Sequence, residues 1–170
     1  MHGTLPDDDA DRRVALRARA WRRAFLGAVT VLVLLGASGL LGVRSSTVTA
    51  SADGYTLTVT YASVTRPGLA TPFAIEVVAE NGFEGGFELE TSSRFLAAFD
   101  ENGLDPEPVT TMADGTWTTW GFEQPTSTRF KLSFDARLEP AVQWRTPGET
   151  RLVVGDRVVA QVAYMMWVMP

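Results

Sequence analysis

The chain has 170 residues, a formal net charge of −5 and no cysteine, which excludes disulfide bonds, thiol catalysis and thiolate metal sites. Residues 44–170 alone carry a net charge of −7, which argues against nucleic acid or anionic lipid headgroups as partners of this segment. The only histidine, His2, precedes this segment, so no imidazole is available there for nucleophilic catalysis. We therefore expect a non-catalytic protein without a cofactor.

The first feature along the chain is an uncharged run of twenty residues, 24–43. A helix of that length, rising about 1.5 Å per residue, crosses the roughly 30 Å hydrocarbon core of a bilayer. Six arginines precede the run, whereas Arg44 is the only cation close behind it. By the positive-inside rule, we expect a disordered cytoplasmic tail over 1–23, a single transmembrane helix over 24–43 and an extracytoplasmic domain over 44–170.

A cleaved signal peptide is the alternative to a retained anchor. The apolar core of a signal peptide usually spans about 7–15 residues and is followed closely by a small-x-small cleavage site. Here the nearest such site is Ala50-Ser51-Ala52, beyond Arg44 and inside a stretch that we expect to form two strands around a turn. We therefore favour a signal-anchor in the cell membrane, with the lipid bilayer as the partner of residues 24–43.

The rest of the chain shows the patterns of short β-strands. Apolar and polar residues alternate in period two, most clearly over residues 55–61 and 130–138, and turn signals such as Asp53-Gly54 and Asn81-Gly82 separate the segments. Strands are expected at about 47–51, 55–65, 72–80, 85–92, 109–112, 116–122, 128–138, 150–154 and 157–168. The pattern predicts an antiparallel immunoglobulin-like β-sandwich after the helix, with a small barrel as the alternative.

The period changes between residues 92 and 103. Ser92 or Ser93 is a candidate N-cap, apolar residues follow at helical spacing, and Asn102-Gly103 is a stop signal. We expect one or two helical turns there.

The stretch 99–108 is the most acidic part of the outer segment. Its oxygen-bearing side chains are of the kind that calcium prefers: Asp100, Asn102, Asp105 and Glu107. Their spacing departs from the D-x-[DN]-x-[DN]-G loop, and polar turns use the same residue types. We expect a polar loop that ends the helix and no metal site, with a calcium site as the weaker alternative.

Three apolar features are candidates for partner contact. Trp117 and Trp120 are three residues apart on a strand, so one should enter the core and the other face outward; we expect Trp120 to be exposed. Phe83 lies in a glycine-flanked tip, "NGFEGG". On the last strand, Met165, Trp167 and Met169 share one face, opposite Tyr164 and its neighbours.

The last strand is therefore apolar on both faces. Runs of this kind are usually buried on both sides. The alternative is an uncovered face that docks on a partner, because methionine and tryptophan adapt well to interfaces.

The stretches "VTRPGLATPF", "FDENGLDPEP" and the terminal "VMP" resemble those of single-pass actinobacterial membrane proteins with an immunoglobulin-like outer domain. The resemblance implies no activity. We expect an accessory protein that contacts another membrane or envelope component, without nucleic acid as a partner. The alternative is a glycan- or cell-wall-binding module that uses an exposed tryptophan.

Overall fold

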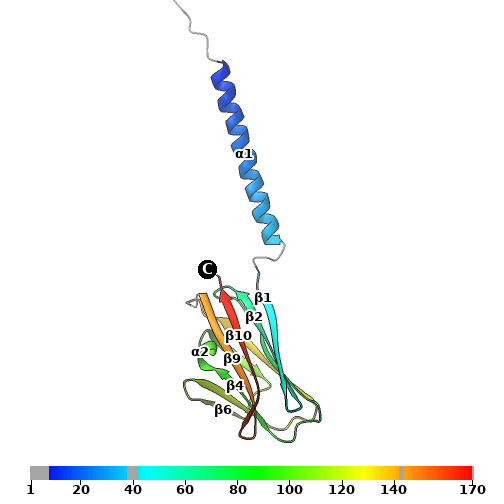
Figure 1. The fold of residues 1–170 in the computed structure, drawn as a ribbon. Helices are drawn as coiled ribbons and strands as arrows, with labels where there is room; N and C mark the ends of the chain where they lie inside the picture. Colours follow the sequence, from blue (N-terminus) through cyan, green and yellow to red (C-terminus); the bar gives the residue numbers. More distant parts are fainter. Residues whose placement is uncertain (1–7, 38–41, 142–143, 170) are drawn as a thin grey trace, which may run out of the picture. The chain divides into compact units, whose positions relative to one another are not determined.

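The computed structural model describes residues 8–37, 42–141 and 144–169, with the side chains of all of these except 8–15, 101 and 102. The chain divides into two compact units, with the boundary between Gly42 and Val43. The first unit holds one long helix and the second is built mainly from strands (Figure 1).

Helix α1 spans Asp8–Ala37. Its segment Leu16–Ala37 is long and apolar enough to cross a membrane, as the helices of membrane anchors and of signal sequences are. The expected transmembrane span, 24–43, is shifted relative to this helix: Gly42 and Val43 are not helical, and residues 38–41 lie outside the described part. Arginine is a good helix former, which agrees with the extension of the helix into the basic side of the apolar run.

Among the described residues, the second unit contains ten strands and one short helix, α2. In chain order these are β1 (Arg44–Ala52), β2 (Tyr55–Thr65), β3 (Phe73–Ala79), β4 (Phe87–Ser92), α2 (Ser93–Leu96), β5 (Phe99–Asp105), β6 (Thr110–Ala113), β7 (Trp117–Phe122), β8 (Arg129–Leu138), β9 (Trp144–Val154) and β10 (Arg157–Val168).

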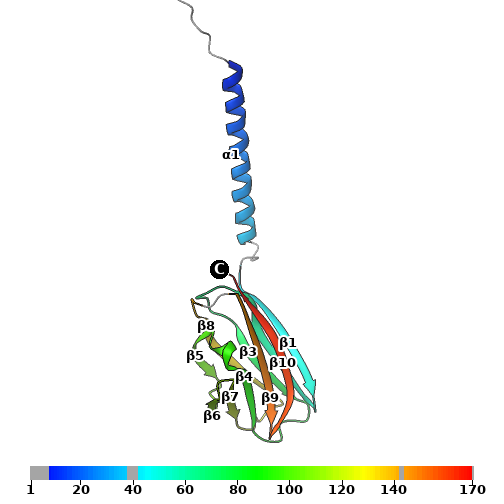
Figure 2. The ribbon, with the colours of Figure 1, turned by 60° about the vertical axis from the view of Figure 1, so that its left-hand side comes forward.

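The strands form two layers. One layer contains β1, β2, β3, β8 and β5, and the other contains β10, β9, β4, β7 and β6 (Figure 2). A short parallel pairing joins the layers, with Trp167 opposite Val64 and Val168 opposite Thr65. The other strand pairs among the described residues are antiparallel. The expected helix followed by an antiparallel β-sandwich is confirmed.

Aromatic side chains fill the space between the layers. Trp120 of β7 meets Phe134 of β8 with ring centroids 5.1 Å apart, and Tyr61 of β2 meets Tyr164 of β10 at 4.9 Å. Each pair joins one layer to the other, and such contacts add about 0.5–1.5 kcal/mol beyond the area that they bury. The core is therefore held by packing, in a chain without disulfides.

A buried chain of hydroxyl groups joins β4, β9 and β10, three neighbouring strands of one layer. Thr150 on β9 lies 3.1 Å from the hydroxyl of Thr91 and 2.9 Å from that of Tyr164. Both threonines are fully buried, so these contacts satisfy groups that have no access to water. Burial raises the pKa of Tyr164 above its ordinary value, although the hydrogen bond with Thr150 acts in the opposite direction.

The expected helical turn within 92–103 is present as α2, but it ends at Leu96 and not at Asn102-Gly103. The acidic residues that follow form β5 and not the expected polar loop, and Phe99 of this outer strand lies opposite Leu138 of β8. Ser92 occupies the N-cap position, but its hydroxyl makes no capping hydrogen bond and accepts one from the Glu149 amide. Pairing with β8 therefore outweighs the weak strand propensity of aspartate, asparagine and glycine.

Strand β9 begins earlier than expected and contains Pro147 and Gly148. β4 pairs with β9 only from Thr150 onward. Pro147, which has no backbone N–H, therefore lies in a part of β9 where β4 forms no hydrogen bonds with the strand. A Cβ on Gly148 would lie 2.1 Å from a ring carbon of Tyr164, so only glycine fits beneath that ring.

Replacing Tyr164 with phenylalanine tests the buried hydroxyl chain. We expect Tyr164→Phe to lower the free energy of unfolding at neutral pH by about 1 kcal/mol, the usual contribution of one hydrogen bond. Because the pKa of Tyr164 is raised in the folded state, this residue contributes fully to the free energy of unfolding below about pH 10, and its contribution falls as the pH rises further. In urea unfolding curves at alkaline pH, the free energy of unfolding of the variant should therefore fall less with pH than that of the original chain. An equal alkaline loss in both proteins would contradict the assignment.

Candidate contact surfaces

Phe83 and Trp120, two of the expected contact residues, are buried. Phe83 is 5% exposed and packs between Tyr55 and Phe87, with its ring centroid 6.0 and 5.0 Å from theirs. Trp120 is 1% exposed and lies opposite Leu89 of β4, so the two side chains point to the same, inward face. The prediction that these two residues contact a partner is therefore wrong.

Trp117 occupies the other face of β7, as the three-residue spacing predicts. Its ring is half-buried beneath the guanidinium of Arg151, whose central carbon lies 3.8 Å from the ring centroid. This cation–π contact occupies the ring face that a ligand would otherwise use.

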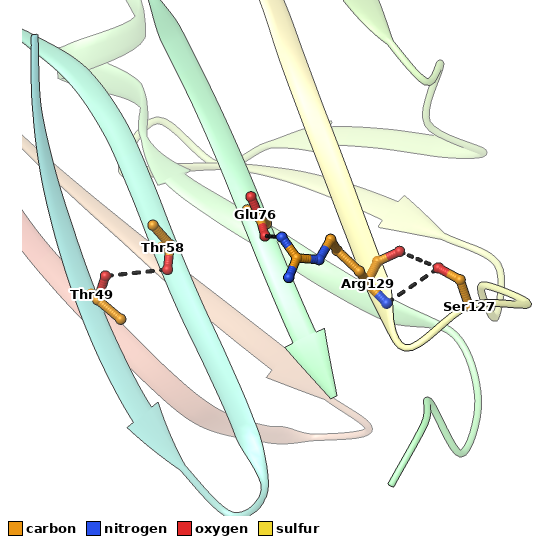
Figure 3. A network of polar contacts seen from close by, with 5 residues as sticks. All are labelled: Thr49, Thr58, Glu76, Ser127 and Arg129. Carbon is orange, nitrogen blue, oxygen red and sulfur yellow. Dashed lines mark hydrogen bonds and ion pairs between the residues drawn. The ribbon is translucent and has the colours of Figure 1, made fainter. Parts of the chain in front are cut away.

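The outer face of β1 and β2 carries a ladder of hydroxyl groups. Thr49 and Thr58 are 3.2 Å apart (Figure 3). The flanking cross-strand pairs Thr47–Thr60 and Ser51–Thr56 are 3.4 and 2.8 Å apart. Farther across the same layer, Arg129 forms an ion pair of 2.6 Å with Glu76, and its backbone bonds with Ser127 (Figure 3). This face is polar and its groups are paired with one another.

The acidic stretch 99–108 does not form a calcium site, which is the weaker alternative for these residues. Asp100 lies opposite Arg137 and Asp105 opposite Ser133, so about 13 Å of strand separates the two aspartates. Calcium binds its ligands at about 2.3–2.6 Å, so one ion cannot reach both. Glu107 follows on the exposed segment after β5, and the side chain of Asn102 lies outside the described residues. Within the described part, no group of three or more acidic or histidine side chains could hold a metal.

The last strand has one buried and one uncovered face. Tyr164, Met166 and Val168 enter the core, whereas Met165 is half-buried and Trp167 is 47% exposed. Met169, directly after the strand, is 48% exposed. The expected burial of both faces is therefore wrong, whereas docking of the uncovered face on a partner stays a prediction.

Exposed apolar side chains gather at one end of the sandwich, where β1 begins. We call this end the tether end. Of the seven large apolar side chains exposed in the described part of the sandwich, four lie there and only three elsewhere. The four are Leu69, Trp144, Trp167 and Met169.

Trp144 is the most exposed of these residues and was not identified from the sequence. Its side chain is 72% exposed, and its backbone has a φ of 73°, in the left-handed region that bulky residues rarely adopt. This conformation costs about 1–2 kcal/mol for an L-residue. The side chain of Trp144 is therefore exposed, although its backbone conformation is unfavourable and the ring would gain from burial.

A second exposed apolar site lies on β6. This strand ends the hydrogen-bonded order of strands that begins with β5. All four residues of Thr110–Ala113 are exposed, with Met112 at 61% and the preceding Val109 at 64%. Among the described strands, β6 pairs only with β7, so its outer edge is open. A pocket of about 510 Å³ lies beside it, lined in part by Val109, Thr110 and Phe122.

The turn before β7 fixes the position of β6. The Asp114 carboxylate accepts hydrogen bonds from the backbone amides of Trp117 and Thr116, at 2.6 and 2.8 Å. These bonds, that of Trp117 foremost, hold the pKa of Asp114 below its usual value. The open edge of β6 is thus presented by a defined hairpin.

No family of known proteins matches the chain, and no curated protein is significantly similar to it. The resemblance to actinobacterial single-pass proteins therefore stays a prediction. The functional argument rests on the geometry above.

Two tryptophan substitutions test the division into core and surface. Trp120→Ala should lower the free energy of unfolding by about 3–5 kcal/mol, because it leaves a large cavity between the layers. Trp167→Ala should lower it by less than about 1 kcal/mol, because half of this ring is already in solvent. Chemical unfolding of the full chain in micelles measures both. Similar losses for the two variants would contradict the assignment.

Proposed function

We propose that the chain is a single-pass membrane protein whose sandwich acts outside the cytoplasm as a non-catalytic interaction module for another membrane or envelope protein. The open edge of β6 is the observation that carries this proposal. Helix α1 would supply the anchor, and the arginines at its amino side favour an N-terminus in the cytoplasm by the positive-inside rule.

The place of β1 in the sandwich supports a retained anchor. β1 pairs with β2 from Arg44 to Ala52, and its Val48 and Ala50 pack against the core. A cut after the Ala50-Ser51-Ala52 site would remove this whole strand and uncover β2. Cleavage at this small-x-small site would therefore disrupt the sandwich, which favours a retained anchor.

The edge of β6 has the properties of a strand-addition site. Edge strands of soluble domains are usually guarded by charges, as β5 is by the exposed Asp100 and Asp105. β6 has no charged residue, and it exposes Met112 next to its free edge. An extended segment of a partner could add to this edge through backbone hydrogen bonds and place side chains beside Val109.

Glycan binding is the second candidate function, favoured by the exposure of Trp144. The tryptophan first expected to bind sugar, Trp120, is buried, and arginines already stack on Trp117 and Trp167. Binding of the full chain to isolated envelope polysaccharide, lost in Trp144→Ala, would favour this function over the first.

Photo-crosslinking at β6 tests the interaction module. A photoreactive amino acid at Met112, in cells that make the full chain, should capture a partner protein. The same group at Thr49, on the hydroxyl ladder, should capture little, because that face is polar and its groups are paired. Mass spectrometry of the adducts identifies the partner.

A charged variant supplies the control for this experiment. Thr111→Lys places a cation on the open edge and should abolish capture from Met112 without changing the unfolding curve, because Thr111 is exposed. Equal capture from Met112 and Thr49, or capture that survives Thr111→Lys, would contradict the proposal.

A further inference from the structure

The first and last strands of the sandwich meet at the tether end. Arg44, which starts β1, and Trp167, near the end of β10, both lie opposite Val64 of β2. Trp144, which starts β9, lies opposite Val168, and the Met169 amide donates to the Thr65 carbonyl at 2.9 Å. The point where the chain enters the sandwich is therefore surrounded by the exposed tryptophans.

Arginines accompany the apolar side chains at this end. The central carbon of the Arg145 guanidinium lies 4.7 Å from the ring centroid of Trp167. Arg66, in the loop after β2, is half-buried, and its Nε is buried without a hydrogen-bond partner in the described structure. Tryptophan and arginine together are typical of the membrane–water interface, where the ring enters the apolar boundary and the guanidinium meets phosphate.

The charges of the sandwich are divided between its two ends. The turns at the opposite end hold five carboxylates and one arginine: Asp53, Glu80, Glu84, Glu123, Asp156 and Arg157. The described loops and strand ends of the tether end hold four arginines and two carboxylates: Arg44, Arg66, Arg137, Arg145, Asp100 and Glu139. The tether end is therefore locally positive although residues 44–170 carry a net charge of −7, so this end suits an anionic surface better than the opposite end does.

The length of the connecting chain limits how far this end can lie from a membrane. If Leu16–Ala37 spans the bilayer, six residues, 38–43, separate the span from Arg44. Even fully extended, six residues reach only about 20 Å. The start of β1 at the tether end therefore stays within about 20 Å of the end of this span.

We infer that the tether end rests in the headgroup region of the bilayer that anchors the chain, with Trp144 and Trp167 at the acyl boundary and the arginines on lipid phosphates. The inference rests on the membrane anchoring in the proposed function. It assigns the tether end to the phosphate-bearing surface of the bilayer and the edge of β6 to a protein partner. Contact through several side chains would orient the sandwich and the β6 edge relative to the membrane.

Spin labels on the full chain test this contact, and the absence of cysteine makes each label unique. Met169→Cys labels the tether end and Asp156→Cys labels the opposite end. In vesicles of phosphatidylcholine and phosphatidylglycerol, with a nickel chelate on both sides, the Met169 label should be several-fold less accessible to nickel than the Asp156 label, and more accessible to oxygen. Adding Trp144→Ser and Trp167→Ser should raise its nickel accessibility toward that of the Asp156 label.

Flotation of the same vesicles tests membrane anchoring by α1 separately from lipid contact by the tether end. A chain that does not float with the vesicles contradicts the anchoring. A chain that floats while both labels are equally accessible to nickel overturns the lipid contact alone. Vesicles of phosphatidylcholine only also carry phosphate and should still protect the Met169 label, and loss of protection in them would overturn the contact between the arginines and lipid phosphate.

Discussion

The organisation of the sandwich depends on the end of β2, where one residue has a partner strand on each side. Val64 lies opposite Arg44 of β1 and opposite Trp167 of β10, and the second pairing is the parallel bridge that joins the two layers. This arrangement brings the start and the end of the domain together. It also gathers Trp144, Trp167 and the nearby arginines around the entry of the chain, whereas the carboxylate-bearing turns lie at the far end.

The core behind this bridge is held by rings and hydroxyl groups, since the chain has no cysteine. Tyr164 has three roles: it packs against Tyr61 of the other layer, extends the buried hydroxyl chain of Thr150, and covers Gly148. A single side chain thus connects β10 with β2 and β9.

Period-two patterns were sufficient to predict most of the fold, including β2, β3, β4 and β8, because each has one face in the core and one in water. β5 was missed because its stability comes from pairing with β8, which local propensity does not reveal. The sequence showed that Trp117 and Trp120 face opposite ways, but only the register with Leu89 decides that Trp120 is inside. Phe83 is in a glycine-flanked turn whose tip folds back on Phe87, and the cluster around Trp144 joins residues far apart in the chain.

Labelling of single cysteines in intact cells tests most directly whether the helix stays in the membrane with the sandwich outside. Thr49→Cys, on the exposed face of β1, should react with a membrane-impermeant maleimide, and the labelled chain should still contain residues 24–43. His2→Cys should react only after the membrane is permeabilised. A Thr49→Cys chain that reacts only after permeabilisation, or that has lost residues 24–43, would contradict the account.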